Sequence, residues 1–451
     1  MSLVSRNPAT EEVLQTFAPL TSEQIRSCID RADQAWQSYR LTPIPQRCSW
    51  LRQTAHLLRQ DQEKYADLIS LEMGKTLTSA RAEVEKSAWV CEYYAEMGSH
   101  LLQPLPVTDH STIHYQPLGV LLAVMPWNFP FWQVFRFAAP ALVAGNTALL
   151  KHAANVPQCA LAIAELLHQA GFPEDVFQTL LISGSQVAEV IGDGRVRGAS
   201  LTGSEPAGIS LATAAAQGIK PLVLELGGSD PFIILPSADL EVAIPTAVAA
   251  RLIANGQSCI AAKRFIIHEQ IWEPVLAGLL ERFQAVKLGD PRDPGTDLGP
   301  LATEAIRLEL HGQVQRAVAA GAQVLLGGEL PPGPGYFYPP TLLVGLDPQE
   351  AVAQEEFFGP VALLFQVQDL EEAIQVANAT PFGLGASAWT RDPQEQARLI
   401  RDLQAGSVFI NAMTQSDPRV PFGGIKRSGY GRELGSFGLY ELVNIQAVSI
   451  Y

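Results

Sequence analysis

Residues 118–152 read LGVLLAVMPWNFPFWQVFRFAAPALVAGNTALLKH, and this stretch decides the fold. It opens with a short apolar run at residues 120–124, continues through an apolar segment at 131–143, and closes with a second short run at 147–150. Short apolar runs joined by a helix are typical of parallel strands buried on both faces, because the crossover helix covers one face. The stretch therefore predicts a strand–helix–strand unit.

The same alternation recurs along the rest of the chain. Further strands are expected at residues 177–182, 199–202 and 221–226, and a second series at 264–268, 324–326, 361–367, 386–389 and 408–411. Helical stretches lie between the members of each series, whereas residues 1–100 read as helices. The chain is therefore predicted to be α/β, with a doubly wound parallel sheet and a second α/β domain.

The composition narrows the possible partners. The 451 residues include 31 basic and 46 acidic side chains, which give a formal net charge of −15, and 47% are hydrophobic. An acidic chain without a basic block is a poor match for nucleic acid. No apolar run approaches the ~18 residues that cross a bilayer, and the start, MSLVSRNPATEEV, shows no secretory signal. We expect a cytoplasmic protein without nucleic-acid or membrane partners.

The cysteines and histidines point to a single reactive thiol and to no metal. Five cysteines lack the spacing of a zinc site or a disulfide scaffold, and the histidines are scattered. Four of the cysteines lie in helical stretches and read as core residues. Cys259 alone lies in a loop of small polar residues, NGQSCIAAKR. Because a reactive thiol needs an accessible setting, Cys259 is the candidate nucleophile; the alternative is an inert surface thiol.

Three other segments place polar side chains at the ends of predicted strands, where open α/β sheets bind their ligands. Asn128 in MPWNFP is either an amide donor or a helix cap. The turn at Gly203 and Ser204 in LTGSEPAG is either a phosphate site at a helix start or an ordinary turn. Glu225 in LELGGSDP is either a general base, if burial raises its pKa, or a cap for loop amides.

Eight motifs occur in order along the chain, and together they resemble the aldehyde dehydrogenase superfamily. They are MPWNFP, LLKHAAN, LTGSEPAG, LELGGSDP, NGQSCIAAKR, EEFFGPV, NATPFGL and PFGGIKRSGYGRE. The resemblance implies a dinucleotide-binding domain at residues 1–106 and 120–227, a catalytic domain at 228–429, and a small β oligomerisation arm at 107–119 and 430–451. It also implies a homodimer or a dimer of dimers.

The resemblance assigns the chemistry to three residues. Cys259 would attack the aldehyde, and the Asn128 side chain and the Cys259 backbone N–H would hold the resulting oxyanion. Transfer of a hydride to a nicotinamide would leave a thioester on the thiol. Glu225 would then activate the water that releases the acid.

The resemblance also implies the coenzyme contacts. Lys151 ends a strand in LLKHAAN and would reach the ribose or a 2′-phosphate. Ala154 stands where NAD-specific members often carry a glutamate that repels a phosphate, so NADP is permitted, although Ala154 offers no hydroxyl to bind it. Lys151 slightly favours NADP over NAD. The other expected coenzyme contacts are made by Trp127, Gly203, Ser204, Glu356 and Phe358.

The expected substrate follows from Arg136, eight positions after Asn128. Eight positions are about two helical turns, so both side chains share a face. A guanidinium there calls for a substrate carboxylate, which its planar fork binds; the alternative is an internal acidic partner. In the family that the chain resembles, this face lines the substrate tunnel, and Ser416 lies in a loop that borders the same tunnel. The string Ser416-Asp417-Pro418-Arg419 resembles bacterial succinate-semialdehyde dehydrogenases.

The expected reaction is therefore the oxidation of succinate semialdehyde to succinate. Glutarate semialdehyde and a general aliphatic aldehyde stay open as other substrates, because one methylene is worth only ~1–3 kcal/mol of discrimination. A non-catalytic oligomeric protein on the same fold is the alternative from another class.

Overall fold

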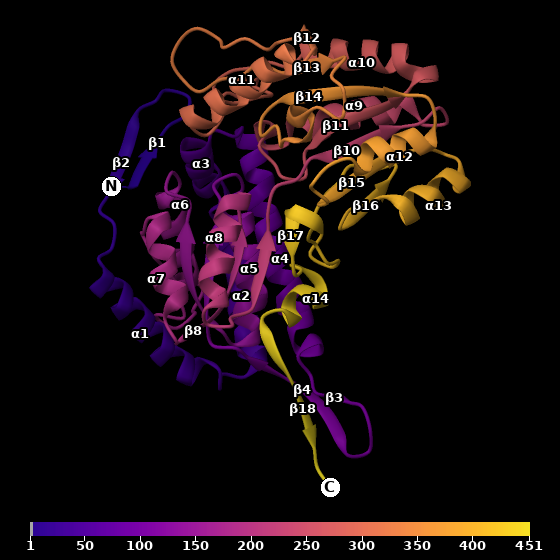
Figure 1. Cartoon of the computed structure of the whole chain (residues 1–451). Helices are drawn as coiled ribbons and strands as arrows, with labels where there is room; N and C mark the ends of the chain where they lie inside the picture. The colour runs from indigo at the N-terminus through magenta and orange to yellow at the C-terminus, as the bar shows by residue number, and fades with distance from the viewer. Residues whose placement is uncertain (1–2) are drawn as a thin grey trace.

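A computed structural model describes residues 3–451 and shows two lobes and a projecting arm (Figure 1). The first lobe is built on a six-stranded sheet of order β17-β9-β8-β5-β6-β7, parallel except for β17 at one edge. Its strands are β5 (Val120–Met125), β6 (Thr147–His152), β7 (Phe177–Thr179), β8 (Val196–Thr202), β9 (Leu222–Glu225) and β17 (Gly429–Tyr430). The sheet confirms the doubly wound architecture expected from the apolar runs.

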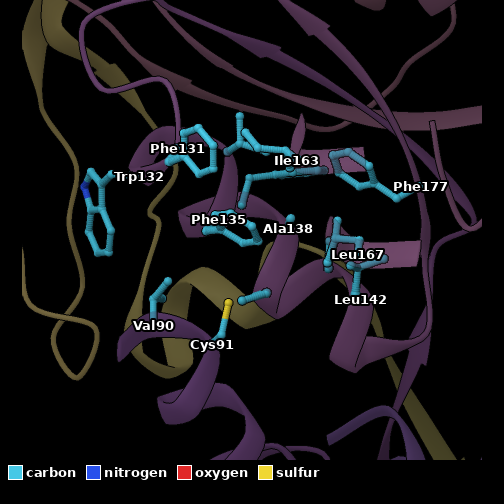
Figure 2. Close-up of a cluster of buried hydrophobic side chains, with 14 of the residues drawn as sticks. Val90, Cys91, Phe131, Trp132, Phe135, Ala138, Leu142, Ile163, Leu167 and Phe177 are labelled. Carbon is cyan, nitrogen blue, oxygen red and sulfur yellow. The ribbon is translucent and has the colours of Figure 1, made fainter. Parts of the chain in front are cut away.

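Helices cover both faces of this sheet. They are α1 (Ser22–Tyr39), α2 (Ile44–Gln60), α3 (Gln62–Met73), α4 (Leu77–Leu101), α5 (Trp132–Ala144), α6 (Pro157–Gln169), α7 (Val187–Gly192) and α8 (Glu205–Ala216). All 13 residues of α5 are buried. Figure 2 shows Cys91 of α4 in the same cluster of buried hydrophobic side chains as Phe131, Phe135 and Leu142, so Cys91 is a core residue. The apolar character of residues 131–143 thus reflects a helix enclosed on all sides.

The second lobe contains a seven-stranded sheet of order β12-β13-β14-β11-β10-β15-β16, parallel except for β12. Its strands are β10 (Asp230–Ile234), β11 (Ala262–His268), β12 (Gln323–Leu326), β13 (Thr341–Val344), β14 (Val361–Val367), β15 (Gly385–Trp389) and β16 (Ser407–Ile410). Its helices are α9 (Leu240–Leu252), α10 (Trp272–Gln284), α11 (Glu304–Ala319), α12 (Leu370–Asn378) and α13 (Pro393–Asp402). The second α/β unit is also as expected.

The arm is a three-stranded antiparallel ribbon that projects from the body and ends near the C-terminus (Figure 1). It consists of β3 (Leu105–Pro106), β4 (Ser111–Pro117) and β18 (Val443–Ser449), in the order β18-β4-β3. Tyr430 pairs with Leu224 in the first sheet, and α14 (Gly435–Tyr440) follows it. The ribbon is therefore shorter than the segment 430–451 assigned to the arm. Its role in oligomerisation stays a prediction.

Some elements differ from the sequence expectation. Residues 1–100 are not helical throughout, because β1 (Leu3–Arg6) and β2 (Val13–Phe17) form an antiparallel hairpin. The strand β2 is mostly exposed, so it carries little of the apolar signal that marks a buried strand. The strands β10 and β13 and the helix α9 were also absent from the expected series.

Two properties of residues 3–451 bear on the predicted partners. No helix in this range is long and apolar enough to cross a membrane. The same range contains no group of three or more His, Cys, Asp or Glu side chains arranged to hold a metal ion.

Candidate active site

Two cavities meet at Cys259. The larger has a volume of about 510 Å³ and lies against the carboxyl ends of β5, β8 and β9. The smaller, of about 190 Å³, lies between α4, α5 and the segment 415–422. Cys259 lines both cavities, so a molecule bound in either one would lie beside this residue.

The loop that carries the thiol is held in a strained conformation. Ala254 and Asn255 have φ values of 52° and 59°, in the left-handed region that non-glycine residues seldom adopt. Each such residue costs on the order of 1–3 kcal/mol and persists where its surroundings enforce it. Here the Asn255 amide donates to the carbonyls of Gly74, at 2.8 Å, and Pro300, at 2.9 Å. The strain is thus supported by both lobes.

Lys263 fixes the other side of the loop. Its buried Nζ donates to the carbonyls of Ser258, at 2.7 Å, and Cys259, at 2.6 Å, and lies 3.3 Å from Glu356 Oε1. Sequence reasoning did not single out this lysine. Burial raises the pKa of Cys259 to about 12, although the charges of Lys263 and Arg136 oppose the shift. The thiol is therefore protonated at neutral pH, so its proton must leave before or during attack.

Asn128 lines the larger cavity together with Cys259. Its Nδ2 donates to the Gln257 carbonyl at 3.0 Å, and its Oδ1 accepts from the Phe129 N–H at 3.1 Å. These bonds fix which way the amide points. A primary amide has two N–H donors, so one donor is left for an oxyanion formed at Cys259.

Glu225 ends β9 and is 2% exposed. Neither carboxylate oxygen has a hydrogen-bond partner among residues 3–451. Burial raises the pKa of Glu225 well above its usual value; Glu433 adds to this effect, while Arg136 and Arg432 oppose it. A buried carboxyl with a raised pKa and free oxygens is suited to general-base chemistry.

Arg136 has the internal acidic partner that the sequence left open as an alternative. The guanidinium forms an ion pair with Glu433, and Nη2 donates to Thr202 Oγ1 at 3.2 Å. Ser200 Oγ in turn donates to Glu433 Oε1 at 2.9 Å. Arg136 nevertheless lines the smaller cavity with Cys259. Its charge is therefore balanced within the protein before any ligand arrives.

Ser416 lines the same cavity and accepts a hydrogen bond from Lys86 Nζ at 2.8 Å. Sequence reasoning missed Lys86, because its contact with Ser416 joins residues 330 positions apart. The structure thus brings Arg136 and Ser416 together with the thiol and adds a second cation.

Five of the seven expected coenzyme residues line the larger cavity: Trp127, Gly203, Ser204, Glu356 and Phe358. The rings of Trp127 and Phe358 meet edge to face, with centroids 5.7 Å apart. Glu356 Oε1 accepts from the Gly228 N–H at 3.1 Å. Lys151, at the end of β6, and the exposed Ala154 lie outside this cavity.

The turn after β8 fits a phosphate-bearing ligand. A Cβ at Gly203 would approach only a Leu201 methyl group, at 3.7 Å, so the backbone there is open. Ser204 precedes α8 but its side chain makes no capping hydrogen bond, so the hydroxyl and the first N–H groups of the helix are available. The cavity therefore suits a dinucleotide with its phosphates at this turn.

The fold and this site define a class: a thiol oxidoreductase with a dinucleotide cavity on one side of its cysteine and a substrate cavity on the other. The aldehyde dehydrogenase family model matches residues 2–448, and the chain belongs to that family. It is 55% identical over 453 residues to a probable succinate-semialdehyde dehydrogenase (NADP⁺) of Synechocystis sp., with 100% of each chain covered.

Two further proteins that are similar to this chain carry the same enzyme name. The succinate-semialdehyde dehydrogenase (NADP⁺) of Mycobacterium leprae is 52% identical, again over 100% of both chains. The crystal structure of succinic semialdehyde dehydrogenase from Streptococcus pyogenes, in complex with NADP⁺, matches with a TM-score of 0.97 and 38% identity, over 99% of each chain.

Proposed function

We propose that the protein oxidises succinate semialdehyde to succinate with NADP⁺. The observation that carries this proposal is the smaller cavity at Cys259, whose lining includes the polar side chains of Arg136 and Ser416. An aldehyde with a terminal carboxylate matches a cavity that has a thiol and cationic groups in its wall. Full-length relatives at 52–55% identity carry the name of this activity and of this coenzyme, which supports the proposal.

The chemistry begins at the thiol. The Cys259 thiol gives its proton to water as Sγ attacks the aldehyde carbon, and a hemithioacetal oxyanion forms. The free N–H of Asn128 Nδ2 and the Cys259 backbone N–H hold this oxyanion. The bound nicotinamide dinucleotide supplies the hydride acceptor for this class of reaction. After oxidation, the acyl group remains on Cys259 as a thioester.

Glu225 completes the turnover. Because its pKa is raised, its carboxylate takes up a proton more readily than an exposed glutamate would. It removes a proton from the water that attacks the thioester, and the acid leaves as the thiol is restored. The ion pair of Arg136 with Glu433 lies beside this carboxyl and fixes the local charge.

Trp127, the Gly203–Ser204 turn, Glu356 and Phe358 would hold the dinucleotide in the larger cavity. Lys151 would reach the 2′-phosphate of NADP⁺, and the short Ala154 leaves room for that phosphate. The chain would form a homodimer or a dimer of dimers, joined through the arm. Its location would be cytoplasmic.

A panel of aldehydes, with and without a terminal carboxylate, tests it when run with each coenzyme and followed by the absorbance of the reduced nicotinamide. We expect the highest kcat/KM for succinate semialdehyde with NADP⁺. Equal kcat/KM for succinate semialdehyde and butanal would contradict the substrate assignment. A higher value for glutarate semialdehyde would move it to the longer acid. Faster turnover with NAD⁺ than with NADP⁺ would contradict the coenzyme assignment.

A further inference from the structure

Lys86 is a cation without an acidic partner in the wall of the substrate cavity. It projects from α4 into the cavity that Cys259 also lines. Its Nζ lies 4.6 Å from the centroid of the Trp132 ring and donates to Ser416 Oγ. Within residues 3–451, Lys86 forms no ion pair of 4 Å or less, whereas Arg136 in the same wall is paired with Glu433.

The carboxylates nearest to Lys86 are already occupied. Glu83, one turn earlier on α4, pairs with Lys75 and accepts hydrogen bonds from the N–H groups of Phe131 and Trp132. Asp417, beside Ser416, is bonded to Arg419, with Nε 2.9 Å from Oδ1. The wall of the cavity therefore carries one more positive charge than its internal partners balance.

Burial sets the ionisation of Lys86. Desolvation lowers its pKa to about 8, and Arg136 on α5 adds to the shift, while Asp417 and Glu83 oppose it. A partly desolvated ammonium gains when an anion replaces its lost hydration. A carboxylate that entered the cavity would meet this ammonium and the Ser416 hydroxyl together.

We propose that Lys86, acting with Ser416, is the residue that selects aldehydes bearing a terminal carboxylate. Lys86 supplies the uncompensated charge, Ser416 fixes the position of the Lys86 ammonium, and Arg136 contributes only the part of its guanidinium that Glu433 leaves free. The inference rests on the proposed function, since it names the determinant of substrate choice in the same cavity. Lys86 does not touch the reacting carbon and is a specificity residue.

Replacement of the charge tests the assignment. Lys86→Met keeps an apolar stem against Trp132 and removes the ammonium. We expect kcat/KM for succinate semialdehyde to fall about 10–150-fold, mainly through KM, because a charged hydrogen bond is lost. The value for butanal should stay within about twofold, since butanal makes no such bond. Lys86→Arg should retain most of the preference.

A matched control is Lys64→Met. Lys64 lies on α3, is exposed, and also faces an aromatic ring, that of Tyr65, at 5.3 Å. This change removes one positive charge from the chain without touching the cavity. It should leave the ratio of the two kcat/KM values, for succinate semialdehyde and for butanal, as in the wild type.

The pH dependence of that ratio tests the assignment without any substitution. A lysine with a lowered pKa is charged below that pKa and loses its charge above it. The wild-type ratio should therefore be constant below pH 7 and fall about tenfold by pH 9, as a group with a pKa near 8 loses its proton. Because the ratio is taken at each pH, the titration of Cys259 and Glu225 cancels. The ratio for Lys86→Arg should stay flat.

The outcomes separate the two proposals. A wild type that shows no preference for the carboxylate would overturn the proposed function. A wild type that prefers it, with a ratio that is unchanged in Lys86→Met or flat from pH 7 to pH 9, would overturn the role of Lys86 alone. If Lys86→Met does not fold, the wild-type pH profile and Lys86→Arg still decide the question.

Discussion

The two cavities that meet at Cys259 are built in different ways. The larger is walled by the ends of strands, by glycine turns, by aromatic rings and by α11, and its lining includes Glu309, Glu355 and Glu356. Lys263, which fixes the thiol loop, donates to backbone carbonyls and pairs with Glu356. The smaller is walled by helices, by aromatic rings, by the paired Arg136 and by the unpaired Lys86. The larger cavity thus offers backbone groups and carboxylates to a ligand, while the smaller one offers cations.

This difference bears on recognition. A ligand bound through backbone groups tolerates many side-chain changes, because the N–H donors persist whatever side chains surround them. A ligand bound through one or two cations depends on single side chains. The net charge of −15 gives neither cavity an attractive long-range field, so anions must be held by local groups. Substitutions should therefore act on the two cavities unequally.

The largest effect is expected at Cys259, the residue that this prediction concerns and that lines both cavities. Cys259→Ser removes the nucleophile and should lower kcat by on the order of 10⁴–10⁶-fold for every aldehyde, charged or not. Titration of the protein's fluorescence should show that NADP⁺ binding is kept. The control is Cys28→Ser, a thiol at the edge of the core, which should retain activity. Unequal losses of kcat on charged and uncharged aldehydes would contradict the claim that Cys259 is the nucleophile for both.

The next effect concerns the oxyanion. Asn128→Ala removes one donor and should lower the single-turnover rate about 10²–10³-fold, with little change in thermal stability. The loss should be the same for succinate semialdehyde and butanal, because the oxyanion is common to both. A single-turnover rate like that of the wild type would contradict the role given to Asn128.

A smaller effect tests the expected site of the 2′-phosphate, beyond the larger cavity. Ala154→Glu introduces a carboxylate where the 2′-phosphate is expected, and like charges repel. We expect kcat/KM for NADP⁺ to fall on the order of 10–100-fold. The value for NAD⁺, which lacks the phosphate, is the internal control and should hold. A parallel fall for both coenzymes would indicate a general disturbance of the β6 end.

The smallest effect tests the pair in the smaller cavity. The double variant Arg136→Met/Glu433→Gln removes both charges at once, so the net charge of the cavity wall is kept. Only a direct hydrogen bond to the substrate is then lost, and kcat/KM for succinate semialdehyde should fall about 2–12-fold. This is less than expected for Lys86→Met, and a larger fall would shift the main charge contact to Arg136.

The single variant Arg136→Met should behave differently, because Glu433 would keep its charge without a partner. Loss of one member of a buried ion pair costs about 3–5 kcal/mol of stability. The melting temperature should therefore drop in Arg136→Met and recover in the double variant. Equal melting temperatures would indicate that the pair contributes nothing to the fold.

Local sequence predicted what depends on local structure. The thiol loop, the amide of Asn128 and the glycine turn at Gly203 were found because the composition of a few adjacent residues marks the end of a buried strand. Neither Lys86 nor Lys263 was found, since lysines are seldom buried and their settings depend on residues from other elements. Ser416 is 330 positions from Lys86, and no local pattern reports such a contact.

The sequence could not decide between the two roles of Arg136 for the same reason, because the answer depends on a residue from another element. The argument from helical spacing was wrong, because Asn128 precedes α5 and lines the larger cavity, whereas Arg136 lies within α5 and lines the smaller one. Whether a guanidinium there awaits a ligand or already has a partner depended on Glu433, which approaches from near the other end of the chain. The hairpin β1–β2 was missed for a different reason, since β2 is mostly exposed and does not alternate between buried apolar and exposed polar residues.

Lys263 has one further consequence. Its ammonium bonds the carbonyl of Cys259 and faces Glu356, so it connects the thiol loop to a residue that lines the larger cavity. If Glu356 turns toward a ligand, the lysine charge is less balanced and the thiol becomes more acidic. By thermodynamic reciprocity, ionisation of the thiol then alters the affinity of that ligand by the same factor. One buried ammonium thus couples ligand binding near Glu356 to the ionisation of the Cys259 thiol.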